Sequence, residues 1–476
     1  TPDSQSAAAV GKGMEMYKSE VGEYPKWNPW IFSGVPAAHS LQHVSRYYPP
    51  HIILKELNNI GLPKFINYLI HFLFMGMGCF LILYRRNINL FACIYTGLAF
   101  TIMPYLITMI VHGHGSQMMT SAYIPWIFLF LEKLRNKTNL KNLSILALLI
   151  GFQLLRGHVQ IAYYTWLIIG SYSLFHLVND FKNKQFNSFK NYYLFLFISL
   201  LIGFATSVQL YYPAHSYSPF SIRGGTGGGT GFEYATAWSF SFGEMLTFFN
   251  PNYYGFGGST YWGNMPFTDY PNYMSILSIL FMLFAVIFVK NKLTKILLFI
   301  WISSLLLSFG HNTPIYNFFY SYFPFFNKFR VPAMFLIILQ FSTVLLAGLG
   351  INVVFKNKIK DFKNYLPFIV SFGILILSKL LSNSMVSNSA KSHPMLNPTR
   401  LEMLNDGFMF SLIILILVLI MKILFEINIL KKELFGIALL GLLFFDLYNV
   451  NEKIIQPNDK FSKKQLLMSK KDFNKL

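Results

Sequence analysis

Carboxylates are the residues of this chain most suited to acid-base chemistry. Four of them lie within the first 23 residues: Asp3, Glu15, Glu20 and Glu23. The sequence contains no DxD, HExxH, GxSxG or Walker pattern, so metal-dependent, serine-dependent and nucleotide hydrolysis lack support. An isolated carboxylate can still act as a general base if it reaches the substrate with a suitable pKa. Asp3 is our first candidate; the alternative is that it caps a helix over the SQSAAAVGKGMEM segment that follows it.

Two histidines, His112 and His114, form the sequence HGHG at the end of an apolar run. A pair of histidines two residues apart could bind a metal ion. The pair could also line a polar site and hydrogen-bond a phosphate, or bond to backbone and serve the fold alone. The sequence leaves these alternatives open.

A second polar cluster, RGHVQ, places Arg156, His158 and Gln160 between two apolar stretches with hardly any loop. Polar side chains at such a depth are unfavourable unless they face a cavity or a partner, which favours a functional site. The alternative is a tight turn at the membrane surface with a snorkelling arginine.

The long polar stretch 214–271 carries Arg223 beside a run of glycines, an arrangement suited to an anion. The run lacks the strand, lysine and hydroxyl of a P-loop, so it is a weak signal alone. A carboxylate among aromatic rings is a common sugar-binding arrangement, and the same rings could form an interfacial belt. The sugar or acceptor candidates are Glu244, Trp262 and Asp269 in this stretch, with Trp27 and Gln160 elsewhere.

Two further cations, Lys328 and Arg330, precede an apolar run that begins near residue 332. Cations at the start of a helix could hold a lipid phosphate. Ordinary interfacial snorkelling is the alternative.

The composition is that of a polytopic membrane protein. Of 476 residues, 54% are hydrophobic and only 12% charged, whereas soluble proteins usually contain about 25% charged residues. The formal net charge of +20 is therefore tested first against the positive-inside rule, and we expect no nucleic-acid partner. Cys79 and Cys93 lie in apolar runs, which predicts neither a disulfide nor a metal site.

Twelve apolar stretches are candidates for spanning helices, which need about 20 apolar residues unless neighbours shield them. They are approximately 65–84, 88–111, 118–131, 142–156, 158–178, 192–213, 272–290, 295–309, 332–355, 365–381, 408–425 and 434–449.

If these stretches alternate across the membrane, one set of connections collects most of the loop lysines and arginines. The positive-inside rule makes that side cytoplasmic. The opposite, outer side then receives 1–64, 214–271, 310–331, 382–407 and the tail from 450. We expect a first extracytoplasmic loop (1–64) and a transmembrane domain (65–449) with the outer loop 214–271. The segment 450–476 is expected to start a larger extracytoplasmic C-terminal region. Because the chain begins with Thr in sequence of this outer type, we also expect a helix or signal before it.

Several motifs in a fixed order give the chain a resemblance to the YfhO-like family of bacterial membrane proteins, which are similar to lipid-dependent GT-C glycosyltransferases. The motifs are PDSQ (2–5), YPKWNPWIFSGVP (24–36), HGHG (112–115), SAYIPWIF (121–128), GHVQIAYY (157–164), FSIRG (220–224), NPNYYG (250–255), TYWGNMPFTDYPNY (260–273) and FNKFRVPAMF (326–335). The likeness extends from end to end of the chain.

The resemblance implies an all-α GT-C-like bundle in the bacterial plasma membrane, with its active face outside. It implies a polyprenyl-phosphate-linked sugar as donor, a cell-envelope glycopolymer or lipid as acceptor, and Asp3 as the base or a metal contact. No cofactor is certain; Mg²⁺ or Mn²⁺ is the candidate. From charge and side, we expect Arg223, Arg330, His112, His114, Arg156 and His158 to hold the departing phosphate. A lipid or polysaccharide transporter, or a noncatalytic membrane scaffold, remains the alternative.

Overall fold

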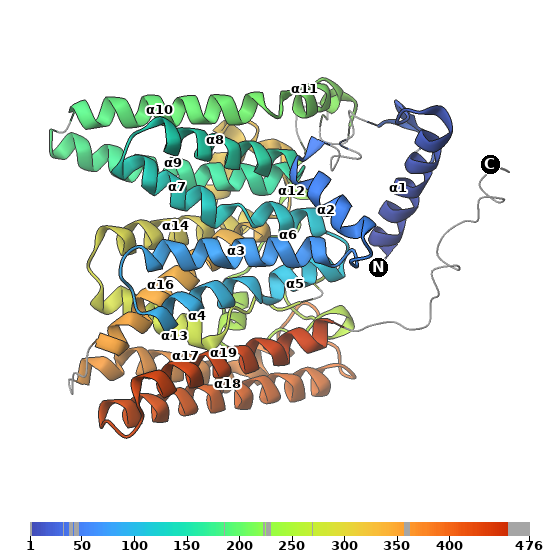
Figure 1. The fold of residues 1–476 in the computed structure, drawn as a ribbon. Coiled ribbons are helices and arrows are strands. Elements are labelled where there is room, and N and C mark those ends of the chain that lie inside the picture. Colours follow the sequence, from blue (N-terminus) through green and yellow to red (C-terminus); the bar gives the residue numbers. More distant parts are fainter. Residues whose placement is uncertain are drawn as a thin grey trace.

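The fold was taken from a computed structural model of the chain, which describes residues 2–31, 33–37, 41, 47–184, 186–221, 224, 230–268, 270–356 and 362–455. Of residues 2–8 and 186–189 it describes the backbone. Within this part, helices form nearly the whole molecule (Figure 1).

The first half contains a small hairpin, β1 (Trp27–Asn28) and β2 (Val35–Pro36), and helices α1 to α9. The helices are α1 (Pro2–Val21), α2 (Pro50–Asn59), α3 (Ile66–Tyr84), α4 (Leu90–Thr101), α5 (Pro104–Val111), α6 (Gly115–Ser121), α7 (Ile124–Asn136), α8 (Leu140–Leu155) and α9 (Val159–Lys182).

The second half contains α10 (Phe186–Ala205), α11 (Val208–Tyr217), α12 (Phe232–Thr236), α13 (Ile276–Phe288), α14 (Lys292–Ser308), α15 (Pro314–Tyr322), α16 (Leu336–Lys356), α17 (Leu366–Ser387), α18 (Asn397–Glu426) and α19 (Lys432–Ile454). Short 3-10 helices are η2 (Ser218–Phe220), η3 (Gly243–Phe248), η4 (Gly258–Thr260), η5 (Gly310–Asn312), η6 (Phe326–Lys328), η7 (Pro332–Phe335) and η8 (Phe362–Tyr365).

Among the described residues, seven helical segments are long and apolar enough to cross a membrane, or eight if a bent pair counts as one span. The seven are 66–84, 90–111, 159–182, 332–356, 362–387, 397–426 and 432–454, and the bent pair is α10 with α11. Since a span needs about 20 apolar residues, the chain is an all-α, multi-pass membrane protein. α8 and α13 are apolar but shorter.

All twelve apolar stretches predicted from the sequence are helical in the structure. Three of them are interrupted. The stretch 118–131 divides into α6 and α7 at Ala122 and Tyr123. The stretch 88–111 divides into α4 and α5 at Pro104, where Met103 is extended with φ −62° and ψ 138°. Proline lacks an N–H and keeps its predecessor out of the helical region, which explains the break. The stretch 192–213 bends by 70° between α10 and α11.

The central helix of the bundle is α16, which packs on α13, α14 and α4. Of its most apolar window, 94% is buried, against 33% for α3. A close approach to α13 depends on Gly350, where an added Cβ would lie 1.8 Å from the Phe281 carbonyl oxygen. Small residues allow such backbone contact between membrane helices. An arrangement with one enclosed helix and amphipathic neighbours lets the other helices present apolar faces to lipid.

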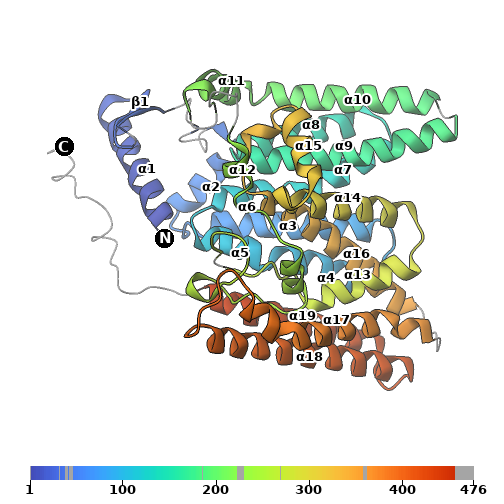
Figure 2. The same ribbon diagram turned by 180° about the vertical axis from the view of Figure 1, so that it is seen from behind.

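One end of the bundle collects the turns that are rich in lysine and arginine, and we call it the lysine-rich end. A cavity of about 310 Å³ there is lined by residues that include Arg86, Asn136 and Lys292. Arg86 pairs with Glu132 of α7, and Arg135 pairs with Asp180 of α9 at 2.5 Å. In Figure 1 this end lies on the left, away from α1, and the rear view in Figure 2 agrees.

The opposite end carries α1, the hairpin, α2 and the long connection 218–275, and we call it the α1 end (Figure 2). Within the described part of 1–64, α1 and the hairpin pack together. In the structure Met14 is buried, the Trp30 ring faces Gly13, and the Trp27 ring faces Gly34, which has a φ of +110°. The polar and aromatic sequence motifs meet at this end.

Candidate functional site

Arg156 occupies the turn between α8 and α9. It follows the last residue of α8, Gly157 reverses the chain with a φ of +83°, and His158 precedes α9. The His158 Nδ1 atom accepts a hydrogen bond from the Ile161 backbone N–H at 3.3 Å. The motif thus forms the tight turn that its sequence suggested, but it turns Arg156 inward, where only 8% of the residue is exposed.

The Arg156 guanidinium lies over an aromatic ring, with its central carbon 5.1 Å from the centroid of Tyr48. Tyr48 lies just before α2, and its hydroxyl contacts His71 Nε2 of α3 at 3.0 Å and the Tyr123 hydroxyl. His71 Nδ1 lies 2.6 Å from the Asn67 carbonyl, so this nitrogen donates and Nε2 accepts from Tyr48. We call Tyr48, His71, Tyr123 and Arg156 the arginine site.

The positive charge of the arginine site has no acidic partner. Within the part of the chain that the structure describes, no carboxylate bonds to Arg156, and its buried Nε has no hydrogen-bond partner. At the lysine-rich end the partly buried Arg135 and the buried Lys422 differ, because each pairs with a carboxylate, at 2.5 and 2.6 Å. A buried charge without a counter-ion is strongly unfavourable, and it marks a place for an anionic ligand.

Burial lowers the pKa of Arg156, and the neighbouring phenols of Tyr48, Tyr123 and Tyr68 act in the opposite direction. An arginine still remains protonated at physiological pH. Burial raises the pKa of the Tyr48 phenol, so Tyr48 stays neutral and keeps the proton that it donates to His71. The arginine site therefore offers one fixed positive charge and neutral polar groups around it.

The helix α2 adds to the positive potential near the arginine site. Its half-buried His51 has a lowered pKa, first through burial and then through the charges of Arg156 and Lys55, while Glu15 of α1 raises it. His51 is consequently neutral near pH 7. Lys55 is exposed, and it lies on the same short helix as His51.

The HGHG motif lies at the same end as the arginine site. His112 follows the last residue of α5, His114 precedes α6, and Gly113 between them has a φ of +86°. Gly115 packs against the ring of Tyr68, whose phenol also acts on Arg156. Tyr68 thus connects the two histidine-containing turns.

Gln160 and Arg330 lie next to each other, although they are 170 positions apart in sequence. The Gln160 amide N–H₂ donates to the Arg330 carbonyl oxygen at 2.5 Å and to the Tyr164 hydroxyl at 2.7 Å. The Arg330 guanidinium donates to the Tyr234 hydroxyl and lies 5.2 Å from that ring. Gln160 therefore holds the 324–335 segment on α9, which leaves the partly exposed Arg330 at the surface of the same end.

Glu244 and Trp262 belong to a separate, folded part of the long loop. Glu244 Oε2 accepts from the Ser241 N–H at 3.0 Å and from its hydroxyl at 2.8 Å, and Oε1 accepts from Tyr261. Trp262 is 2% exposed and packs on Tyr254 with ring centroids 4.1 Å apart. This geometry favours a role in holding the loop, because both carboxylate oxygens are already bonded. Trp27 is 53% exposed and lies on the hairpin.

Three predicted site residues are not fully described by the structure. The side chain of Asp3 in α1, and all of Arg223 and Asp269, are not described. No group of three or more His, Cys, Asp or Glu residues that could hold a metal occurs within the described ranges.

The structure also adds residues that the sequence did not single out. Tyr48, His71, Tyr123 and His51 surround Arg156, and all of them stand in aromatic or apolar surroundings in the sequence. The clearest signal was the lone His71 within an otherwise apolar helix.

Comparison with family models, with curated proteins and with solved structures found no match for the chain. The fold and the site therefore define a class and no more: an all-α, multi-pass membrane protein whose α1 end holds a buried arginine with no carboxylate partner among the described residues.

Proposed function

We propose that the chain is a membrane glycosyltransferase of GT-C type that transfers a sugar from a polyprenyl-phosphate donor to a cell-envelope glycopolymer or lipid. The observation that carries this proposal is the buried Arg156 without a carboxylate partner. A lipid phosphate supplies the missing negative charge and presents it at the depth of a membrane surface.

In the proposed reaction the acceptor hydroxyl attacks the anomeric carbon of the sugar. The bond between that carbon and the phosphate oxygen breaks, and the phosphate leaves with the bonding electron pair. The acceptor proton passes to a base, for which Asp3 is the candidate. Arg156 stabilises the negative charge that grows on the leaving phosphate, which favours the transition state over the ground state.

The proposal includes the topology expected from the resemblance to YfhO-like proteins. The α1 end would face the outside of a bacterial plasma membrane, and the shorter apolar helices α7, α8, α13 and α14 would complete twelve spans, with α6 extending α7. Their packing against longer neighbours supports this count, since shielded helices can be shorter than lipid-exposed ones.

The first experiment measures binding of undecaprenyl phosphate and of uncharged undecaprenol to the protein in nanodiscs. Arg156→Met keeps the apolar stem and removes the charge, and Lys64→Met is the matched control that removes an exposed cation just before α3. Hydrogen bonds to charged groups contribute about 1.5–3 kcal/mol, so Arg156→Met should weaken phosphate binding at least about tenfold. Undecaprenol binding should not change. Equal phosphate affinity for Arg156→Met and wild type would exclude the arginine site.

The binding result for Arg156→Met can be interpreted only if the variant is as stable as the wild type. Because Arg156 is an unpaired buried charge, its removal should not lower the thermal midpoint. A parallel assay follows a labelled sugar from a polyprenyl-phosphate donor to envelope acceptors, in which Asp3→Asn should abolish transfer while phosphate binding persists.

A transporter is the second candidate, and two observations favour it. α10 and α11 form a helix pair bent by 70°, and Gln340 in the buried centre of α16 has neither amide atom hydrogen-bonded. Broken helices and polar side chains at mid-depth are typical of transporters. Movement of a fluorescent polyprenyl phosphate between leaflets of reconstituted vesicles, without sugar transfer, would select this function.

A further inference from the structure

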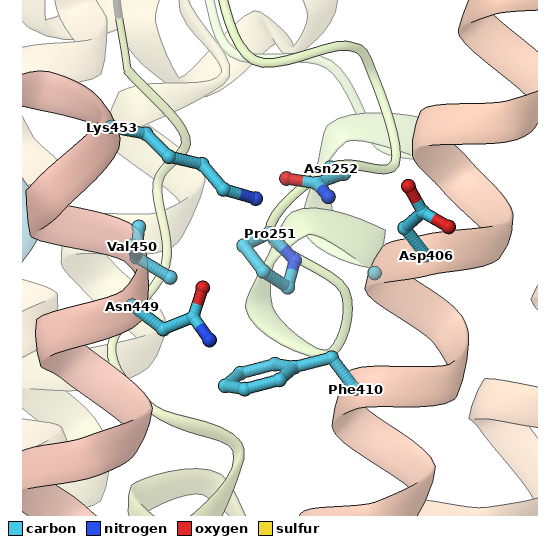
Figure 3. Close-up of a pocket in the computed structure, with 8 residues that line it drawn as sticks. Pro251, Asn252, Asp406, Phe410, Asn449, Val450 and Lys453 are labelled. Atoms are coloured by element: carbon cyan, nitrogen blue, oxygen red, sulfur yellow. The ribbon is translucent and has the colours of Figure 1, made fainter.

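A second polar cavity lies at the α1 end, where α18 and α19 meet the long loop. Its volume is about 210 Å³. The lining residues include Asn252 from the loop, Asp406 and Phe410 from α18, and Asn449 and Lys453 from α19. Figure 3 shows these side chains around one space, with Lys453 and Asp406 on opposite walls. This cavity shares no residue with the arginine site.

The wall formed by the loop is held rigidly. The Asn250 amide N–H₂ donates to the Leu404 carbonyl at 2.9 Å, and its Oδ1 accepts from the Asn252 N–H at 3.0 Å. Gly407 allows this approach, since an added Cβ would lie 2.0 Å from Asn250 Oδ1. These contacts hold the backbone of Asn252 in place, and its side chain faces the cavity.

One acceptor of the cavity has no donor. Asn252 is 4% exposed, and its buried Oδ1 atom has no hydrogen-bond partner. A buried amide oxygen without a partner is unfavourable, because it has lost its hydrogen bonds to water. Figure 3 shows the Asn252 amide directed into the space between α18 and α19. A ligand that brings a hydrogen-bond donor would satisfy it.

The charges and the size of the cavity restrict that ligand. The negative charge of Asp406 repels an anion such as phosphate, and the positive charge of Lys453 repels a simple cation. A neutral group that both donates and accepts hydrogen bonds therefore fits best. The side chain of Phe410 adds an aromatic face, against which the C–H face of a ring can pack. An apolar cavity of about 150 Å³ admits benzene, so a cavity of about 210 Å³ has room for one substituted six-membered ring.

From these observations we infer that Asn252, Asp406, Phe410, Asn449 and Lys453 form a binding site for a neutral sugar ring. Asp406 and the amide oxygen of Asn252 accept hydrogen bonds from its hydroxyls, Lys453 and the Asn449 amide donate to them, and Phe410 packs on the ring. The inference does not depend on phosphate binding at the arginine site or on a transfer reaction.

The test is saturation-transfer difference NMR on the full chain in nanodiscs, without sugar-based detergent. The probes are methyl glucoside, methyl galactoside and N-acetylglucosamine, with glycine as a small zwitterion. At least one sugar should receive saturation on its ring protons. Asp406→Ala and Asn252→Ala should each weaken its binding about tenfold, which corresponds to about 1.4 kcal/mol.

Glu402→Ala is the matched control, because Glu402 is an exposed carboxylate one turn earlier on α18 and does not line the cavity. It should bind like the wild type. Asp406 is itself exposed, so its variant keeps the test valid if Asn252→Ala fails to fold. The inference is overturned if no sugar receives saturation, if both cavity variants match wild type, or if glycine alone binds.

Discussion

At the scale of single residues, Glu244 gives a prediction for the pH dependence of stability. Burial raises its pKa, and hydrogen bonds from Tyr261 and Ser241 and the charge of Lys391 oppose the rise. A carboxyl group whose pKa is higher in the folded state stabilises the fold below its unfolded pKa, and this contribution is lost as pH rises through the folded pKa. Glu244 therefore makes the protein less stable as pH increases from about 4.5 towards neutrality.

Glu244→Gln should reduce the free energy of unfolding by about 1–3 kcal/mol, because one atom of the new amide is a donor that faces an existing donor. The loss should be larger at pH 4.5 than at pH 7.5. The wild type loses stability as the Glu244 carboxyl ionises between these pH values, whereas the variant has no group to ionise at this position. Thermal unfolding in detergent at both pH values measures it, with the exposed Glu402→Gln as control. A loss that does not vary with pH would contradict the raised pKa.

The sequence identified part of the arginine site and missed the rest for a physical reason. Arg156 stood out because a charge between two apolar runs is unfavourable without a function. Tyr48 and Tyr123 did not, since tyrosines are equally common in interfacial belts. For Glu244, its neighbour Ser241 was visible in the sequence, but only the folded loop brings Tyr261 to the second oxygen.

At the scale of helices, contact between α13 and α16 depends on one glycine. A Cβ at Gly350 would lie 1.8 Å from the Phe281 carbonyl oxygen and 3.0 Å from the Ala285 nitrogen, both backbone atoms that cannot turn away. Gly350→Ala should therefore separate the two helices and cost about 1–3 kcal/mol, as overpacking of a core does.

Gly441→Ala is the control for this substitution, because Gly441 lies within α19 with no atom within 4 Å of an added Cβ. It should be neutral or stabilise by up to about 1 kcal/mol, since alanine favours the helix over glycine. Thermal midpoints in one detergent compare the two variants. Equal midpoints would mean that the bundle relaxes around position 350.

Hydropathy predicted where the helices lie but not all of their ends. α18 begins at Asn397, eleven residues before the predicted stretch 408–425, because its first three turns contain polar residues such as Arg400 and Asp406. Those turns pack on the long loop, where the Arg400 Nε–H donates to the Thr260 carbonyl at 3.2 Å. Apolar periodicity cannot report a helix that is stabilised by such polar contacts with a loop distant in sequence.

At the scale of the whole molecule, charge divides the bundle into two ends. At the lysine-rich end the partly buried Arg135 pairs with Asp180 of α9, and the buried Lys422 pairs with Glu426 one turn later on α18. The α1 end instead holds Arg156 without an acid and the polar cavity between α18 and α19. The sequence predicted this division from the alternation of the helices across the membrane. The pairing of side chains within each end could be seen only in the fold.

The positive-inside rule predicts that the lysine-rich end faces the cytoplasm, and α18 provides a direct test of that orientation. Met395, just before α18, is 82% exposed, and Ile429, just after it, is 69% exposed. The native thiols of Cys79 and Cys93 are both buried, which gives a low labelling background. A membrane-impermeant maleimide should label Met395→Cys in intact cells, and Ile429→Cys only after the membrane is opened. The reverse pattern would place the arginine site and the sugar cavity in the cytoplasm, where an acceptor in the cell envelope could not reach them.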